Sequence, residues 1–256
     1  MKRTLQTTLT VLGLAALLSP SAQAQYNPND LLLGFTQSGV QNDYIIDLGN
    51  ANTAVGVGGA NGTDLTSLFN SATFNSTFSG GLSSGVNMGV VGGNQATAGR
   101  DLYITSLRSS LGNPSVPGST APAPVGSTFM SSGVGDVATL VLGLGLTPGG
   151  SATPPQVAAN SWSSLISPGL NPPSFTIDTG RDPMGQASSS VIYEDLYRGT
   201  PNQPFAYVGY FTLDMSGSGS LGFTPSLSVP EPSTFGLLIC GVVLATFFRR
   251  FQRGSR

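Results

Sequence analysis

The stretch DLLLGFTQSGVQNDYIIDL (residues 30–48) contains two short apolar runs, 31–35 and 44–48, separated by a polar turn. Short runs rich in Leu, Ile and aromatic side chains, bounded by turn-forming residues, are typical of buried β-strands. The stretch therefore predicts two neighbouring strands, and the chain that follows continues the same pattern.

Further strand-like segments recur between Gly- and Pro-rich turns. They are residues 86–91, 102–107, 137–146, 175–177 and 191–197. The clearest hairpin joins residues 206–215 to residues 220–224 through the Ser-Gly-Ser-Gly turn at 216–219. No fixed-period repeat is present, so we expect one mainly-β, single β-sandwich-like domain rather than a solenoid or propeller.

Helix signals are fewer. Asp64 is a potential N-cap for a short helix that runs toward Phe74, and Pro154–Pro155 could open a second helix over residues 156–166. Residues 112–125 are crowded with Gly, Pro, Ser and Ala, which predicts a loop. We expect a few short helices beside the strands.

Composition supports a β-rich domain and excludes several functions. Charged residues make up 9% of the 256 residues, whereas Gly (35) and Pro (18) are plentiful. Between residues 25 and 229 four arginines face eleven carboxylates, a net charge of −7 with no Lys. Nucleic acid binding needs a basic surface to neutralise phosphates, so we exclude it.

The N-terminus has the three parts of a secretory signal peptide. Lys2 and Arg3 form the basic region, residues 9–18 are apolar, and Ala22 and Ala24 provide the small residues that signal peptidase requires. We predict a signal peptide at 1–24 and cleavage after Ala24. The alternative, a buried N-terminal helix, does not explain why the three parts follow in this order.

The C-terminus, residues 229–256, joins a proline-rich motif to an apolar run. Pro230, Glu231 and Pro232 form an extended segment, because neither proline can continue a helix. Residues 235–248 then predict a short transmembrane helix of about 21 Å, which spans the ~30 Å hydrocarbon core only marginally. A cluster of arginines at 249–256 would stay in the cytoplasm by the positive-inside rule; its membrane-flanking members are Arg249, Arg250 and Arg253.

This tail resembles the PEP-CTERM sorting signal of bacterial exosortase substrates, with all its parts in order over the last 28 residues. The resemblance implies that a membrane-embedded exosortase recognises residues 230–232 and releases the protein from the inner membrane. It also implies association with extracellular polysaccharide or biofilm matrix. An ordinary single-pass tail is the alternative. A looser resemblance, carried by residues 30–48 and 210–214, links residues 25–228 to β-rich domains that often precede this tail, and it implies no activity.

The exported domain, residues 25–228, offers little catalytic chemistry. The chain has no His, and its one Cys, Cys240, lies in the apolar tail, so Ser-His-Asp, thiol and His-based metal sites are excluded in their usual forms. Carboxylates remain. Glu194 and Asp195 are adjacent and, on a strand, would point to opposite faces, which disfavours a glycosidase pair.

Residues 178–182 and Asn42–Asp43 offer oxygen ligands of the kind that calcium binds, but these acids are better explained as turn formers. We therefore expect no catalytic residues, metal or cofactor. The sequence predicts an exported structural or polysaccharide-associated surface component. A secreted carboxylate-dependent carbohydrate-active enzyme is the alternative.

Overall fold

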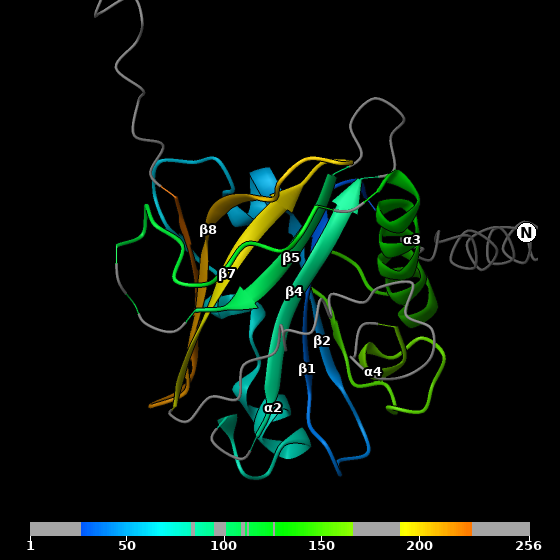
Figure 1. Cartoon of the computed structure of the whole chain (residues 1–256). Helices are drawn as coiled ribbons and strands as arrows, with labels where there is room; N and C mark the ends of the chain where they lie inside the picture. Colours follow the sequence, from blue (N-terminus) through cyan, green and yellow to red (C-terminus); the bar gives the residue numbers. More distant parts are fainter. Residues whose placement is uncertain are drawn as a thin grey trace, which may run out of the picture.

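A computed structural model of the chain describes residues 27–82, 85–94, 101–108, 111, 113–124, 126–165 and 190–226. Within these residues, nine strands form a single antiparallel sheet in the order β3-β9-β8-β7-β5-β4-β1-β2-β6 (Figure 1). The strands are β1 Asp30–Thr36, β2 Tyr44–Asn50, β3 Thr63–Asp64, β4 Asn87–Asn94, β5 Asp101–Leu107, β6 Ser151–Ala152, β7 Val191–Gly199, β8 Ala206–Asp214 and β9 Ser220–Pro225.

Short helices lie between the strands. They are the π-helix η2 Ala51–Val55, the 3-10 helix η3 Thr66–Leu68, and the α-helices α2 Ser71–Thr77, α3 Ser127–Leu144 and α4 Trp162–Leu165. Together with the sheet they confirm a mainly-β fold with few helices. Among the described residues, no helix is both long and apolar enough to cross a membrane.

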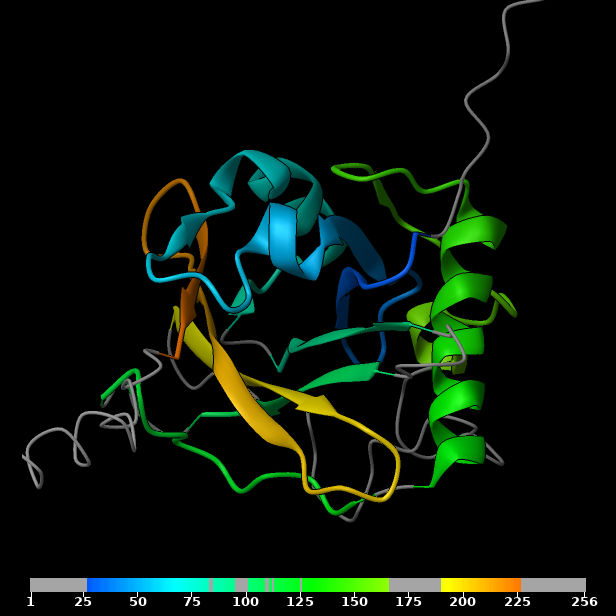
Figure 2. The ribbon, with the colours of Figure 1, turned by 90° about the horizontal axis from the view of Figure 1, so that it is seen from above.

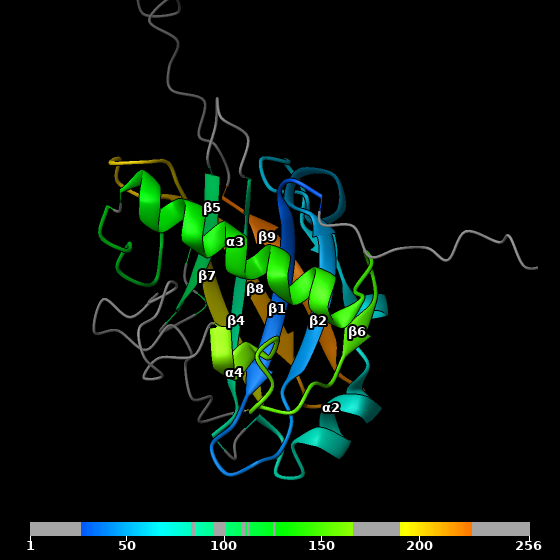
Figure 3. The ribbon, with the colours of Figure 1, turned by 90° about the vertical axis from the view of Figure 1, so that its right-hand side faces the viewer.

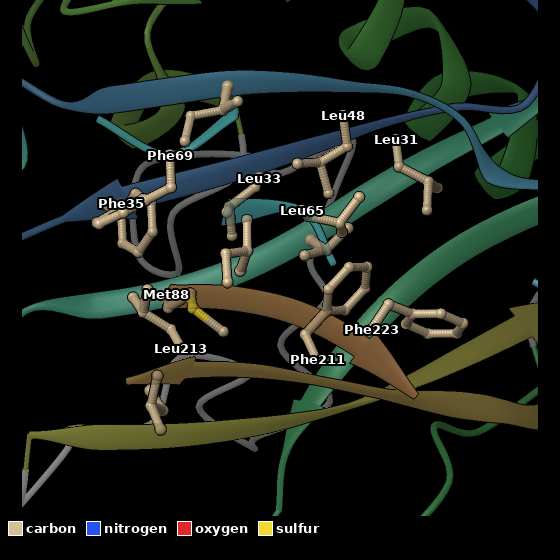
Figure 4. Packing of buried hydrophobic residues seen from close by; sticks show 14 of the residues in the cluster. Leu31, Leu33, Phe35, Leu48, Leu65, Phe69, Met88, Phe211, Leu213 and Phe223 are labelled. Carbon is tan, nitrogen blue, oxygen red and sulfur yellow. The ribbon is translucent and has the colours of Figure 1, made fainter. Parts of the chain in front are cut away.

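The sheet is strongly curled, and its concave face holds the larger hydrophobic core (Figures 2 and 4). Leu31, Leu33 and Phe35 of β1 lie on this face together with Phe211 and Phe223 from the other end of the sheet. The segment from η2 to α2 closes the open side with further apolar side chains. Curling lets one sheet enclose a core that the sandwich prediction had assigned to two packed sheets.

An aromatic cluster forms the closed end of this core. The ring of Phe35 stacks on Tyr44 at a centroid distance of 5.7 Å and meets Phe74 edge-on at 5.2 Å. Phe74 in turn contacts Phe78 at 5.1 Å. Such offset and edge-on pairs add to the free energy gained by burying large rings, so the cluster fixes α2 on β1 and β2.

The convex face of the sheet is covered in part by α3 and α4 (Figure 3). Helix α3 packs Met130, Val134, Val137 and Val141 on strands β1, β2, β4 and β5. Trp162, the first residue of α4, is fully buried against Gly34 of β1, where a side chain at residue 34 would overlap its ring. The close approach explains why a glycine occupies the middle of an otherwise apolar strand.

Several sequence predictions are confirmed. The first two strands form as β1 and β2, the predicted hairpin forms as β8 and β9 with Asp214 opposite Ser220, and residues 113–124 contain no helix or strand. The segment predicted at 175–177 lies outside the described residues. Both helices are shorter than predicted. The first breaks into η3 and α2, with Asn70 rather than Asp64 capping α2, and the second is reduced to α4.

One prediction was wrong. Residues 137–146 were expected to form a strand, but residues 127–144 form helix α3. The buried side chains of α3 recur at intervals of three and four residues, which is the helical period, and the Val and Leu content that suggested a strand serves the helix–sheet contact instead.

Candidate functional site

A buried ion pair joins β5 to β7 on the convex face of the sheet. The Nη1 atom of Arg108, the residue after β5, lies 2.7 Å from Oδ1 of Asp195, and both side chains are at most 1% exposed. Nη1 also donates to the Tyr207 hydroxyl at 3.1 Å, and both Nη atoms donate to carbonyl oxygens of the loop 111–116. Both Nη groups of the guanidinium therefore have hydrogen-bond partners.

The other carboxylate oxygen of Asp195 binds the same loop further along the chain. Oδ2 accepts the backbone N–H groups of Gly118 and Ser119 at 2.7 Å each, and the Ser119 hydroxyl at 2.8 Å. Tyr197 donates to the carbonyl of Ser119 at 3.0 Å. Every group in this cluster is therefore used to hold the loop 111–119 on the sheet.

Electrostatics in this cluster keeps Tyr207 and Arg108 protonated. Burial, followed by the charge of Asp195, raises the pKa of Tyr207 to about 12. Burial lowers the pKa of Arg108, but the hydrogen bond and charge of Asp195 outweigh it and raise that pKa overall. Neither group exchanges a proton near neutral pH, which general acid–base catalysis would require. The cluster is structural.

Glu194 and Asp195 project from opposite faces of β7, as the sequence predicted. Glu194 shares its face with Ile192 and Leu196 of the concave core and is fully buried, whereas Asp195 belongs to the convex-face cluster. A glycosidase needs two carboxyl groups on either side of one sugar. The sheet itself separates these two.

Asp43 anchors α4 through both of its carboxylate oxygens. Its Oδ2 accepts the backbone N–H of Ser163 at 2.6 Å, and its Oδ1 accepts the Ser163 hydroxyl at 2.7 Å. The Ser163 hydroxyl also bonds Thr36 of β1 at 2.8 Å. The second calcium candidate, residues 178–182, lies outside the described residues, and within the described ones no three Asp, Glu or Cys side chains gather into a potential metal site.

Asp47 of β2 is a fully buried carboxylate whose Oδ2 atom has no hydrogen-bond partner. Its Oδ1 accepts the backbone N–H of Gly49 at 2.8 Å. Burial raises the pKa of Asp47 to about 6, against the effect of the Gly49 hydrogen bond, and the charge of nearby Asp30 adds to the rise. Asp30 is 1% exposed, and burial raises its pKa too. Because the pKa values of Asp30 and Asp47 are raised in the folded protein, these two carboxyls make its stability decrease as pH rises.

An open trough of about 430 Å³ lies at the β8–β9–β3 end of the sheet, which α3 does not cover. Its lining residues include Gly222 and the small polar residues Asp64, Thr212, Ser220 and Thr224. Asp64 is the carboxylate of the trough. Its Oδ1 accepts the backbone N–H of Thr66 at 2.9 Å. Hydrogen bonding to the Thr66 side chain, and then to this backbone N–H, lowers the pKa of Asp64, so the carboxyl is ionised at neutral pH.

Strand register explains how the trough arises. Tyr193 pairs with Thr212, Thr212 with Gly222, and Gly222 with Asp64, so these four residues form one row across β7, β8, β9 and β3. The flanking residues of β8 and β9 face the concave core. The sequence carried a signal for this site, because polar and apolar residues alternate along 220–224, but a single strand does not reveal which neighbours complete a row.

The residues predicted to direct sorting lie outside the described residues. They are Ala22 and Ala24 at the signal cleavage site, Pro230, Glu231 and Pro232 in the sorting motif, and Arg249, Arg250 and Arg253 beside the apolar run. The described domain ends close to that motif. Its last backbone hydrogen bond, from the N–H of Ser226 to the carbonyl of Val208, precedes Pro230 by four positions.

No protein-family model, curated protein or solved structure matches the chain.

Proposed function

We propose that the chain is an exported, bacterial-type surface protein whose tail is processed by an exosortase, and that its domain is a non-catalytic structural or polysaccharide-associated component. The observation that carries the proposal is the Pro-Glu-Pro motif at 230–232, followed by an apolar run and an arginine cluster. The N-terminal signal at 1–24 supports export. The mature protein would act at the cell surface or in the extracellular matrix.

The domain's geometry supports a structural role. The carboxylate oxygens of Asp195 accept hydrogen bonds that hold a loop, and those of Asp43 accept hydrogen bonds that hold α4. Glu194 is buried in the core. The last backbone hydrogen bond of the described domain, made by the Ser226 N–H, lies four positions before Pro230. Because an extended residue covers at most about 3.5 Å, the membrane anchor would hold the β8–β9 edge close to the bilayer until the tail is cut.

Glu231→Ala tests the sorting motif. In a host with an exosortase, we expect this variant to insert into the membrane but to stay there, because the processing enzyme would lose the one carboxylate of the tail. Ser233→Ala, two positions further on and outside the tripeptide, is the matched control and should be released like the parent. Fractionation of cells into membrane and medium, with the size of each product, is the measurement.

Two outcomes would refute the proposal. Release of Glu231→Ala at the parent's rate would make the tripeptide incidental and the protein a plain single-pass anchor. Hydrolysis of a polysaccharide by the purified chain, abolished by changing Asp64 or another single carboxylate, would favour the carbohydrate-active enzyme instead. Turnover should therefore be assayed across pH on the released protein.

A further inference from the structure

We propose that the trough across β8, β9 and β3 is a binding site for an uncharged polysaccharide chain. This inference rests on the proposed surface role and names the ligand class of that role. The observation behind this inference is the row Tyr193, Thr212, Gly222 and Asp64. The row places an aromatic ring, a hydroxyl, a glycine without a side chain and a carboxylate in line on one open face of the sheet.

The floor of the trough is left open by a glycine that the fold does not require. Gly222 has no positive φ, and a Cβ at this position would meet only the carbonyl oxygen of Thr63, at 3.6 Å. A glycine inside a strand weakens it and is often found where a ligand or another chain approaches closely. We therefore attribute the glycine at position 222 to the approach of a ligand on the open face, and not to packing against the core.

The lining matches the hydrogen-bonding groups of a sugar. Thr212, Ser220 and Thr224 offer hydroxyls that donate and accept, and ionised Asp64 accepts from neighbouring sugar hydroxyls. Adjacent strands lie about 4.8 Å apart, so the row of four spans about 14 Å, the reach of a short oligosaccharide.

Tyr193 supplies an oriented ring at one end of the row. It is partly exposed and meets Tyr210 edge-on at 6.4 Å, and Arg108 lies 4.7 Å from the centre of the Tyr210 ring. The buried cluster around Asp195 thus fixes the ring in place before any ligand arrives. A preorganised surface loses less side-chain entropy on binding.

Other ligands fit the trough poorly. Its lining residues include no Lys or Arg, and ionised Asp64 would repel a phosphate or an acidic polymer. Protein interfaces need buried aromatic or aliphatic anchors, but Leu221 and Phe223 point to the core. Pairing of a second copy along β9 is blocked, because β3 and the Leu65 N–H already occupy that edge.

Affinity electrophoresis tests the inference on the full chain purified in mild detergent. Native gels would contain dextran, hydroxyethyl cellulose or galactomannan as uncharged probes and alginate as an anionic one. We expect at least one uncharged probe to retard the protein and alginate to leave it unaffected. Since the purified chain is used whether or not cells release it, failure of sorting and failure of binding are distinguishable.

Gly222→Val is the decisive variant. Valine favours the strand and has room at this position, so thermal stability should equal or exceed that of the parent, while the filled floor should weaken binding at least tenfold. Thr212→Val should weaken it about fivefold to tenfold by removing one hydroxyl. Thr139→Val, an exposed position on α3, is the matched control and should bind like the parent.

Three results would overturn the inference. One is no retardation by any uncharged probe, and another is parent-like binding by folded Gly222→Val. The third is a dimer in light scattering that Gly222→Val abolishes, which would make a second copy of the chain the occupant.

Discussion

Arg108 and Asp195 lie 87 positions apart in the chain, yet their side chains meet at 2.7 Å in an ion pair shielded from solvent. The pair connects β5, β7 and the loop 111–119 at one point. Because the charges are buried, each is tolerated only while the other is present.

Asp195→Ala should lower the free energy of unfolding by about 3–5 kcal/mol, because it leaves the Arg108 guanidinium buried without its counter-charge. Urea or thermal unfolding measures the loss. The matched control is Arg198→Ala, which removes the 2.7 Å pair with Asp101 at a site where the arginine is 47% exposed. An exposed pair contributes at most about 1 kcal/mol. Equal losses in the two variants would contradict the structural role of the cluster.

Gly34→Ala should displace Trp162 from the convex face, because an added methyl group would overlap the indole ring. We expect a loss of about 1–3 kcal/mol from overpacking. Trp162 is the one tryptophan of the chain, so its fluorescence should shift toward that of a solvent-exposed ring. Gly217→Ala, in open space at the β8–β9 turn, is the control and should change neither property.

Much of the strand content could be predicted from sequence, since the runs at 31–35, 44–48 and 206–215 are apolar, short and bounded by turns. Helix α3 shows the limit. A run such as 137–146 is apolar in either conformation, and only the wider spacing of Met130, Val134, Val137 and Val141 indicates a helix.

Long-range pairing could not be predicted. Nothing near Arg108 in the sequence points to Asp195, and nothing near Thr212 points to Asp64, because strand order brings them together. For the same reason the sequence could not distinguish one curled sheet from two packed ones. The composition of the strands is compatible with both architectures. Which strands pair with one another decides between them.

Ala24→Phe should block removal of the N-terminal signal, because the signal peptidase pocket accepts only small residues at this place. The parent protein recovered from the medium should begin at Gln25 or within a residue or two of it. Gln23→Ala changes the tolerant position between the two alanines and should be processed normally. N-terminal sequencing of both variants is the measurement, and an intact Met1 on mature parent protein would refute export through this signal.

Asp47→Asn should stabilise the protein at neutral pH but not in acid. The folded-state pKa of about 6 lies above the ordinary value of 3.8, so the native state holds this proton more tightly than the unfolded state does. The stability that comes from the protonated form is fully present below pH 3.8 and is lost as pH rises through 6. A shift of about two units corresponds to about 3 kcal/mol.

The asparagine keeps an oxygen for the Gly49 N–H and carries no charge at any pH, so it reproduces the protonated carboxyl. We expect a gain of about 2–3 kcal/mol at pH 7.5 and almost none at pH 4, measured by urea unfolding at both pH values. Asp214→Asn is the control with the opposite sign. Hydrogen bonds from Ser216 lower the pKa of exposed Asp214, so its contribution is present at neutral pH and lost as pH falls. A gain for Asp47→Asn that did not change with pH would show that the pKa of Asp47 is the same in the folded and unfolded proteins, and that burial does not raise it.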